Sequence, residues 1–159
     1  MQEFTHFDSQ GAARMVDVGD KAVTVRAARA SGRVRMRPET ARLIREHGFE
    51  KGDVLGVARL AGILAAKRCG ELIPLCHTVP LDTAEVSFEF LDEQSLAIEG
   101  VARATARTGV EMEALVAVTT AALAIYDMCK SADRSMVIER VRVEEKTGGR
   151  SGRFRRTSP

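Results

Sequence analysis

The order in which two hydrophobic periodicities follow each other is the feature that most restricts the fold of this chain. Val86, Phe88 and Phe90 alternate with polar residues, a pattern that predicts a strand with one side facing solvent. The alternation resumes at Leu96 and continues to about Arg107. A short polar stretch separates the two segments, so we expect them to form an antiparallel hairpin.

Helical periodicity occupies the segments on both sides of this hairpin. A short helix is expected over residues 38–47, with proline in its first turn, and a second over about 53–68. Asp53 can cap the second helix, whose small side chains let another backbone approach closely. Residues 110–132 are rich in Ala and Leu, which predicts a mostly buried helix.

Strand patterns also flank these elements. Residues 23–25 and 34–36 alternate on either side of Ser31-Gly32, which predicts two short strands joined by a turn, and residues 137–143 predict a final strand. Read from Val34, the order is strand, helix, strand, strand, helix, strand. This order predicts an α+β fold of the ferredoxin-like βαββαβ type, an antiparallel sheet with helices on one face, plus an N-terminal strand and an extra helix.

Length and charge indicate how the chain is organised. A chain of 159 residues with 45% hydrophobic and 29% charged residues fits a single globular domain. Residues 1–21 are expected to form an irregular N-terminal arm. Residues 146–159 are expected to form a basic, glycine-rich tail, either solvated or in contact with phosphates. The open face of the predicted sheet is expected to pack against another subunit, giving a homo-oligomer.

Hydropathy and cysteine usage predict a cytoplasmic protein. The apolar runs are too short for a membrane span, and the first residues lack the pattern of a secretory signal. Cys69, Cys76 and Cys129 stand at spacings that match no zinc pattern, so reduced thiols and no metal ion are expected.

Two candidate segments combine ionisable side chains with glycine or proline. Lys51 precedes a helix start, where an anion is favoured; the alternative is a capped helix with a solvated lysine. Lys67 begins a segment that runs through Pro74 to Cys76 and His77, where His77 could act as an acid, a base or a donor. Nucleophilic attack by Cys76 is disfavoured because adjacent side chains usually point apart.

The long apolar segment carries charges at both ends. Glu111 and Glu113 in its first turn would complement the helix dipole. Asp127 and Lys130 share a helix face at i, i+3 spacing, either as a buried structural ion pair or as a functional pair. Glu113 and Asp127 are 14 residues apart, about 21 Å along a helix, so one small substrate cannot easily touch both. A site that uses both is therefore expected to combine two chains.

Several longer motifs, taken together and in order, resemble the MoaC family of cyclic pyranopterin monophosphate synthases. The resemblance extends from about residue 5 to residue 154. The motifs that carry it are Met15-Val-Asp-Val18, Lys51-Gly-Asp53, Ala61-Gly-Ile-Leu-Ala-Ala-Lys67, Leu72-Ile-Pro-Leu-Cys-His77, Gly109-Val-Glu-Met-Glu-Ala-Leu115, Ile125-Tyr-Asp-Met-Cys-Lys130 and Lys146-Thr-Gly-Gly-Arg-Ser-Gly152.

The resemblance implies a specific activity and assembly. It implies conversion of 3′,8-cyclo-7,8-dihydroguanosine 5′-triphosphate to cyclic pyranopterin monophosphate with release of pyrophosphate, an early step of molybdenum cofactor biosynthesis. It also implies a ferredoxin-like fold and a homohexamer, a trimer of dimers with sites at dimer interfaces. No cofactor is expected.

The resemblance also assigns roles to residues. It implies that Asp127 is catalytic, with Lys51 and Lys130 close by. The residues expected to bind substrate are Leu75, Cys76, His77, Glu111, Met112 and Glu113, with Lys67, Lys146 or Arg150 as further phosphate-binding cations. The family usually continues with Pro-Leu after the histidine, whereas this chain has Thr78-Val79-Pro80.

A nucleotide-binding or RNA-binding module without this activity is the alternative. An RNA-recognition sheet displays aromatic side chains, and Phe88 and Phe90 are the candidates on one strand. Because they alternate with Glu85 and Glu89, they are expected to face the core. We therefore expect neither a nucleic acid nor a membrane as a partner.

Overall fold

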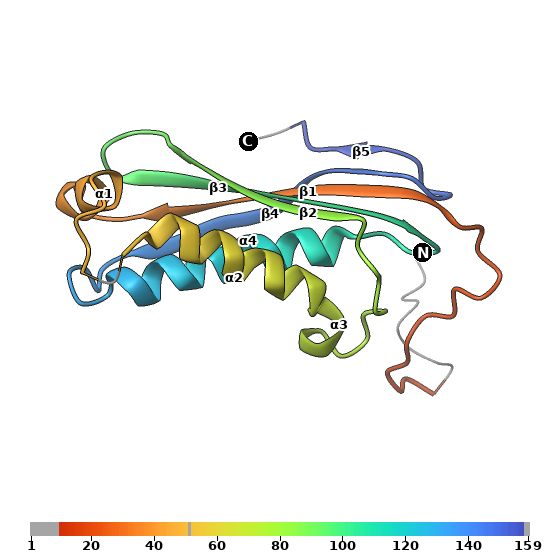
Figure 1. Cartoon of the computed structure of the whole chain (residues 1–159). Coiled ribbons are helices and arrows are strands. Elements are labelled where there is room, and N and C mark those ends of the chain that lie inside the picture. The colour runs from red at the N-terminus through yellow and green to blue at the C-terminus, as the bar shows by residue number, and fades with distance from the viewer. Residues whose placement is uncertain (1–9, 51, 158–159) are drawn as a thin grey trace.

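The chain folds into one antiparallel sheet with helices on one face (Figure 1). The computed structural model describes residues 10–50 and 52–157. The elements, in chain order, are β1 (Thr24–Arg35), α1 (Pro38–Arg45), α2 (Val54–Lys67), α3 (Cys69–Leu72), β2 (Thr83–Phe90), β3 (Ser95–Ala106), α4 (Glu111–Cys129), β4 (Val137–Thr147) and β5 (Phe154–Arg155).

The strand order confirms the predicted fold class. The sheet runs β2-β3-β1-β4-β5, and every neighbouring pair is antiparallel. The first four strands have the ferredoxin-like arrangement, with α1 to α3 in the first crossover and α4 in the second. Figure 1 shows α2 and α4 side by side beneath the sheet.

The predicted N-terminal hairpin is wrong, because β1 is one continuous strand. It pairs with β3 from Thr24↔Ala106 to Arg35↔Ser95 without a turn at Ser31-Gly32. Gly32 lies under α4, where an added Cβ would stand 2.6 Å from Val118 Cγ1. The glycine therefore makes room for a packed helix, and most of the residues predicted to form a separate N-terminal strand are part of β1.

The other predicted elements are present with shifted ends. The β2–β3 hairpin is confirmed, and the Asp53 carboxylate caps α2 by accepting a hydrogen bond from the Gly56 amide at 2.9 Å. Helix α4 ends at Cys129, three residues earlier than expected. Strand β4 continues to Thr147 through two irregularities in its pairing with β1, which interrupt the simple alternation.

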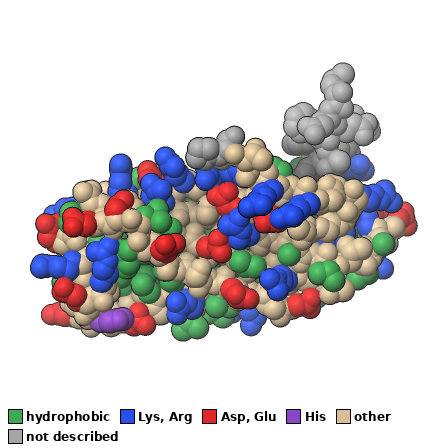
Figure 2. All heavy atoms as spheres, turned by 90° about the horizontal axis from the view of Figure 1, so that it is seen from above, with side chains coloured by type: hydrophobic (Ala, Val, Ile, Leu, Met, Phe, Trp, Pro, Cys, Tyr) green, Lys and Arg blue, Asp and Glu red, His purple; other side chains and the backbone are tan. Residues whose placement is uncertain are grey.

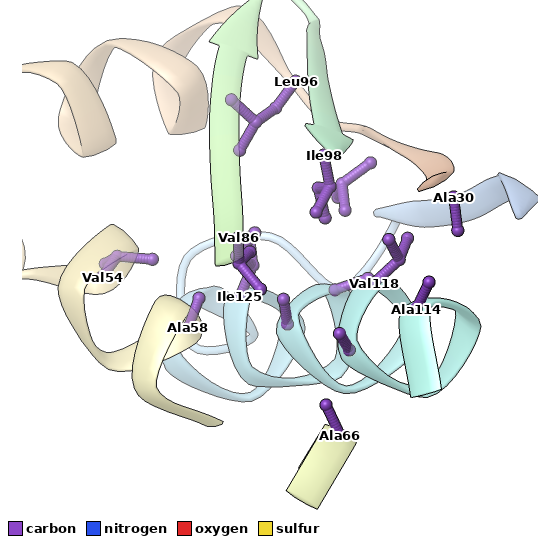
Figure 3. Packing of buried hydrophobic residues seen from close by; sticks show 14 of the residues in the cluster. Ala30, Val54, Ala58, Ala66, Val86, Leu96, Ile98, Ala114, Val118 and Ile125 are labelled. Carbon is purple, nitrogen blue, oxygen red and sulfur yellow. The ribbon is translucent and has the colours of Figure 1, made fainter. Parts of the chain in front are cut away.

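Helix α4 is the centre of the core. Ile98 and Val118 are buried where the helix meets the sheet, and Ile125 is buried further along (Figure 3). A Cβ added to Gly62 of α2 would stand 2.7 Å from the Ala117 carbonyl oxygen of α4. The expectation that small residues allow close backbone approach is thus confirmed at this crossing.

Helix α4 is also long and apolar enough to cross a membrane by length and composition alone. It is the one such helix among the described residues. It packs against both the sheet and α2, and its residues from Glu113 to Cys129 supply much of the core. It is therefore the core helix of a folded domain.

The sheet face without helices is polar. Charged side chains of both signs are mixed across it (Figure 2), including Arg29 and Glu99, whose Nη1 and Oε2 atoms are 2.8 Å apart. Phe88 and Phe90 face the opposite way and pack against the core, as expected. A subunit contact through this polar face stays a prediction.

Some of the large exposed apolar side chains lie on the helix layer, whereas others, such as Val25 and Phe154, lie on strands. Val57, Leu60 and Leu64 follow helical spacing on α2 and are 45%, 63% and 54% exposed. Leu123 of α4 is 54% exposed. We call Val57, Leu60, Leu64 and Leu123 the apolar helix surface.

The two ends of the described chain are irregular or return to the sheet. Residues 10–23 contain turns and one isolated bridge residue. At the other end, β5 pairs with the end of β4. The Arg153 Nη2 lies 2.6 Å from Glu145 Oε1, and the Arg156 amide donates to the Glu144 carbonyl oxygen. The basic tail therefore lies along β4 up to residue 156.

Candidate active site

Two pockets adjoin at the N-terminal end of α4. One, which we call the basic pocket, has a volume of about 630 Å³; the other, which we call the loop pocket, has about 840 Å³. They share the wall residues Lys21, Thr108, Gly109 and Glu111, so they form one continuous depression.

Cations from three parts of the chain line the basic pocket. Arg26 lies on the helix side of β1, beyond the start of α4, and Lys146 lies on the same side of β4, opposite Ala28. The described residues of its wall include five cationic and two acidic side chains: Lys21, Arg26, Arg107, Lys146, Arg150, Asp20 and Glu111.

Backbone carbonyl groups hold the Arg26 guanidinium in place. Its Nε and Nη2 donate to the carbonyl oxygens of Ala106 and Arg107 at 3.3 Å each. The turn after β4 passes over it with Gly148 and Gly149 at φ values of 96° and 72°. A Cβ at Gly149 would collide with the guanidinium, so two glycines are needed at this approach.

The loop pocket is more apolar. Ile73, Leu75 and Met112 form part of its wall, and Cys76 and His77 add polar groups. The loop is fixed on both sides, because Val79 is buried in the core and the Cys76 amide donates to the Ile73 carbonyl oxygen at 3.0 Å. The residues that depart from the family pattern therefore anchor the segment behind His77.

Glu113 lies behind this pocket and is 1% exposed. Its Oε1 is 4.0 Å from the Cys76 sulfur, and its Oε2 has no hydrogen-bond partner among the described residues. Burial raises the pKa of the Glu113 carboxyl. Glu113 is therefore not the exposed acid that dipole complementarity in a first helical turn would require.

Asp127 and Lys130 form an ion pair at the other end of α4. Lys130 Nζ lies 2.6 Å from Asp127 Oδ1, and the two side chains are 51% and 65% exposed. The hydrogen bond and charge of Asp127 raise the pKa of Lys130. Of the two alternatives, the buried structural ion pair is wrong, because both side chains are exposed at the end of the helix.

The structure therefore divides the predicted site residues into two groups. Neither Asp127 nor Lys130 is among the described residues that line the two pockets, and neither is Lys67, which is exposed at the end of α2. Lys51 lies outside the described residues. The predicted residues at the pockets are Leu75, Cys76, His77, Glu111, Met112 and Lys146, with Glu113 behind them.

Three cations of the basic pocket, Lys21, Arg26 and Arg107, were not among the predicted site residues. Arg26 breaks the run of small side chains on the buried side of β1, which was a usable signal. Lys21 is one of only five lysines in a chain rich in arginine. Arg107 directly follows β3, and no local pattern distinguished it.

The pocket pair can bind a polyanion with an attached apolar or aromatic group. The N-terminus of α4, which has no side-chain cap at Val110, adds its helix dipole to the cations of the basic pocket, and both favour phosphate groups. The adjoining apolar wall suits a planar ring system.

Comparison with known proteins gives a consistent result. The family model described as "MoaC family" matches residues 15–149. A relative from Brevibacillus brevis, "Cyclic pyranopterin monophosphate synthase", is 53% identical over 97% of this chain and 96% of its own length. A relative from Thermomicrobium roseum with the same name is 56% identical over 98% of this chain and 95% of its own length.

A third relative, "Cyclic pyranopterin monophosphate synthase 3" from Mycobacterium bovis, is 57% identical over 96% of this chain and 86% of its own length. Identity at this level over nearly the full length of each protein, together with the family match, assigns the chain. It belongs to the MoaC family.

Proposed function

We propose that this chain converts 3′,8-cyclo-7,8-dihydroguanosine 5′-triphosphate to cyclic pyranopterin monophosphate and pyrophosphate, a lyase reaction in molybdenum cofactor biosynthesis. The family membership and the names of the relatives support this activity. The observation that carries it is the basic pocket joined to the loop pocket at the start of α4.

The basic pocket suits the triphosphate. Its five cations outnumber its two acids, and the N-terminus of α4 adds its helix dipole at the same place. Arg26 is already oriented by two backbone carbonyl groups, so little side-chain entropy is lost when it binds phosphate. Release of pyrophosphate requires such cations to stabilise the charge that develops on the leaving group.

The loop pocket suits the ring system. Rebuilding a purine-derived ring into a pterin needs several proton transfers, and His77 and Glu111 line the pocket at positions where they can take part. Cys76 and Met112 contribute to its wall. Glu113 contributes from behind the wall, through Cys76.

Asp127 is the proposed catalytic residue, with Lys130 and Lys51 as its partners. Because Asp127 stands 14 residues along α4 from Glu113, about 21 Å away, we propose that it acts in the site of a second protomer. Its exposure and its contact with Lys130 are consistent with an ion pair that a second protomer can reach. Lys67 and Lys146 are further proposed phosphate ligands.

Such sharing requires an oligomer, and we propose a homohexamer built as a trimer of dimers. The apolar helix surface supports an assembly, because exposed apolar side chains at helical spacing are typical of contact surfaces. We also infer a cytoplasmic location, which is consistent with the three free cysteines.

The test is turnover of the cyclised dihydro-GTP by the purified protein, with pyrophosphate and pyranopterin product followed together. Wild type is expected to form both, whereas Asp127→Asn and Lys130→Ala lose product formation. Glu85→Gln, on the exposed side of β2, serves as a control that stays active. A folded, oligomeric wild type that releases no pyrophosphate would contradict the proposal.

RNA binding remains the alternative function to test, because the tail is basic. Phe88 and Phe90 pack inward. The Arg59 Cζ lies 5.7 Å from the centre of the Phe88 ring, and the Arg45 Cζ lies 4.1 Å from the centre of the Phe90 ring. The two rings are therefore not available as a stacking platform on the open face. Strong, salt-dependent RNA binding would favour this alternative.

A further inference from the structure

Two cysteines and a buried acid meet beside the loop pocket. Cys69 is the first residue of α3, Cys76 lies in the loop that follows, and Glu113 lies in the first turn of α4. The sulfur atoms of Cys69 and Cys76 are 3.9 Å apart, and the Cys76 sulfur is 4.0 Å from Glu113 Oε1. All three ligand atoms lie within 4.8 Å of one another.

The sulfur separation matches that of two ligands around one tetrahedral metal ion, whereas Glu113 Oε1, 4.0 Å from the Cys76 sulfur, would have to move about 0.5 Å closer to reach the roughly 3.5 Å expected for a sulfur and an oxygen ligand. Two thiolates bound to one zinc ion at about 2.3 Å each lie about 3.8 Å apart at the tetrahedral angle. The observed sulfur separation is 3.9 Å, so the two cysteines need almost no rearrangement. A carboxylate oxygen is an accepted third ligand in such sites.

The cluster is mostly buried and leaves one polar atom without a partner in the part of the chain that the structure describes. Cys69 is 2% exposed and Glu113 is 1% exposed, yet Glu113 Oε2 has no hydrogen-bond partner among the described residues. A buried carboxyl oxygen without a partner is costly, and a cation in the cluster would remove that cost. Burial also raises the pKa of Cys69 to about 12 and raises the pKa of Cys76, so without a cation both thiols stay neutral.

We propose that Cys69, Cys76 and Glu113 form a binding site for a zinc-like divalent ion in the wall of the loop pocket. The two thiols lose their protons on binding, Glu113 binds as a carboxylate, and two sulfur–metal bonds and one oxygen–metal bond form. Because Cys76 lines the loop pocket, the ion would be part of its wall, with a fourth coordination position available there. The proposed metal site shares Cys76 and Glu113 with the substrate site proposed above, but metal binding can be measured without substrate turnover.

The spacing of the cysteines conceals this site in the sequence. They are seven residues apart, outside the short spacings of zinc fingers, and the acid is 37 residues further on. The turn at α3 brings them together: the Arg68 amide donates to the Ala65 carbonyl oxygen, and the Ile73 amide to that of Cys69. Tertiary structure thus supplies the proximity that the sequence pattern lacks.

The experiment is a cobalt titration of the purified, reduced wild-type protein under anaerobic conditions. Cobalt replaces zinc and gives thiolate-to-metal charge-transfer absorption when cysteines bind it. We expect one equivalent per chain to produce this absorption, and zinc to displace the cobalt. Cys69→Ala and Cys76→Ala each lower the affinity by more than about 100-fold, since loss of even an outer-shell partner costs about 10- to 100-fold.

Cys129→Ala is the matched control, because Cys129 is a buried cysteine outside the cluster, and it is expected to bind cobalt as wild type does. Glu113→Gln keeps the shape of the side chain and is expected to weaken binding while both thiolates still give charge-transfer absorption. Circular dichroism establishes that each variant is folded. Absence of thiolate-to-cobalt absorption in folded wild type would overturn the proposal, as would equal binding by folded Cys69→Ala.

Discussion

Two inactive variants of this protein should restore activity to each other when they are mixed. Helix α4 carries wall residues of the pockets in its first turn and Asp127 near its end, about 21 Å along the axis by the rise of 1.5 Å per residue. A single side chain does not span that distance. The proposed site therefore takes its pockets from one protomer and Asp127 from another.

The suitable pair of variants is Lys146→Ala, which alters the basic pocket, and Asp127→Asn, which removes the exposed carboxylate. Each alone leaves every site defective. In randomly mixed oligomers half of the sites have an intact pocket, and half of those also receive an intact Asp127. About one quarter of wild-type turnover per chain is therefore expected, whatever the symmetry of the assembly.

The assay uses the two proteins unfolded together at equal concentration, refolded, and compared with each variant refolded alone. Asp127→Asn mixed with Lys130→Ala is the matched control, because these side chains form one ion pair on one turn and must come from the same protomer. That mixture should stay inactive. If the mixture of Lys146→Ala and Asp127→Asn shows only the sum of the separate activities, the site lies within one chain and the reasoning is refuted.

Three further changes test the packing and the pocket. Gly62→Ala should lower the free energy of unfolding by up to about 2 kcal/mol, because overpacking costs about 1–3 kcal/mol against a helix-propensity gain of about 1 kcal/mol; a raised Tm would contradict this. The hydrogen bonds of buried Asp133 to Arg37 and Ser135 outweigh its desolvation and lower its pKa to about 2. Asp133→Ala should therefore cost about 2 kcal/mol at pH 7, and in acid unfolding titrations the difference from wild type should shrink as the pH falls from about 4 through 2. Gly149→Ala should displace the Arg26 guanidinium and raise KM for the triphosphate more than it lowers kcat, whereas Gly152→Ala, with φ also positive but open space around it, should leave KM unchanged.

Local patterns predicted the elements whose cause is local. The alternation around Phe88 and the cap at Asp53 act within a few residues, and both are present in the structure. Ser31-Gly32 misled the prediction because the same dipeptide suits a turn and a strand under a close-packed helix. Only the position of Val118, far along the chain, decides between them.

The candidate site was predictable in its parts and not in its arrangement. Recognisable motifs identified the loop through His77 and the first turn of α4, and these do meet at one pocket. Arg26 and Arg107 enter the site because the start of β1 lies beside the end of β3, which depends on the strand register. The contact of Cys69 with Cys76 depends on a turn whose geometry no spacing rule describes.

The straight course of α4 also limits how this chain can vary in length. Inserting one residue between Glu113 and Asp127 would turn everything beyond it by about 100° and advance it by about 1.5 Å. If the insertion followed Val118 and the Ala117–Gly62 and Val118–Gly32 contacts kept their places, the Asp127–Lys130 pair would leave the outward face. If the insertion preceded Ala117 and the first turn of α4 kept its place at the pockets, those two contacts would be lost. Natural and designed variants should therefore change length in the surface turns, such as the one between β2 and β3, and keep the residue count of α4 constant.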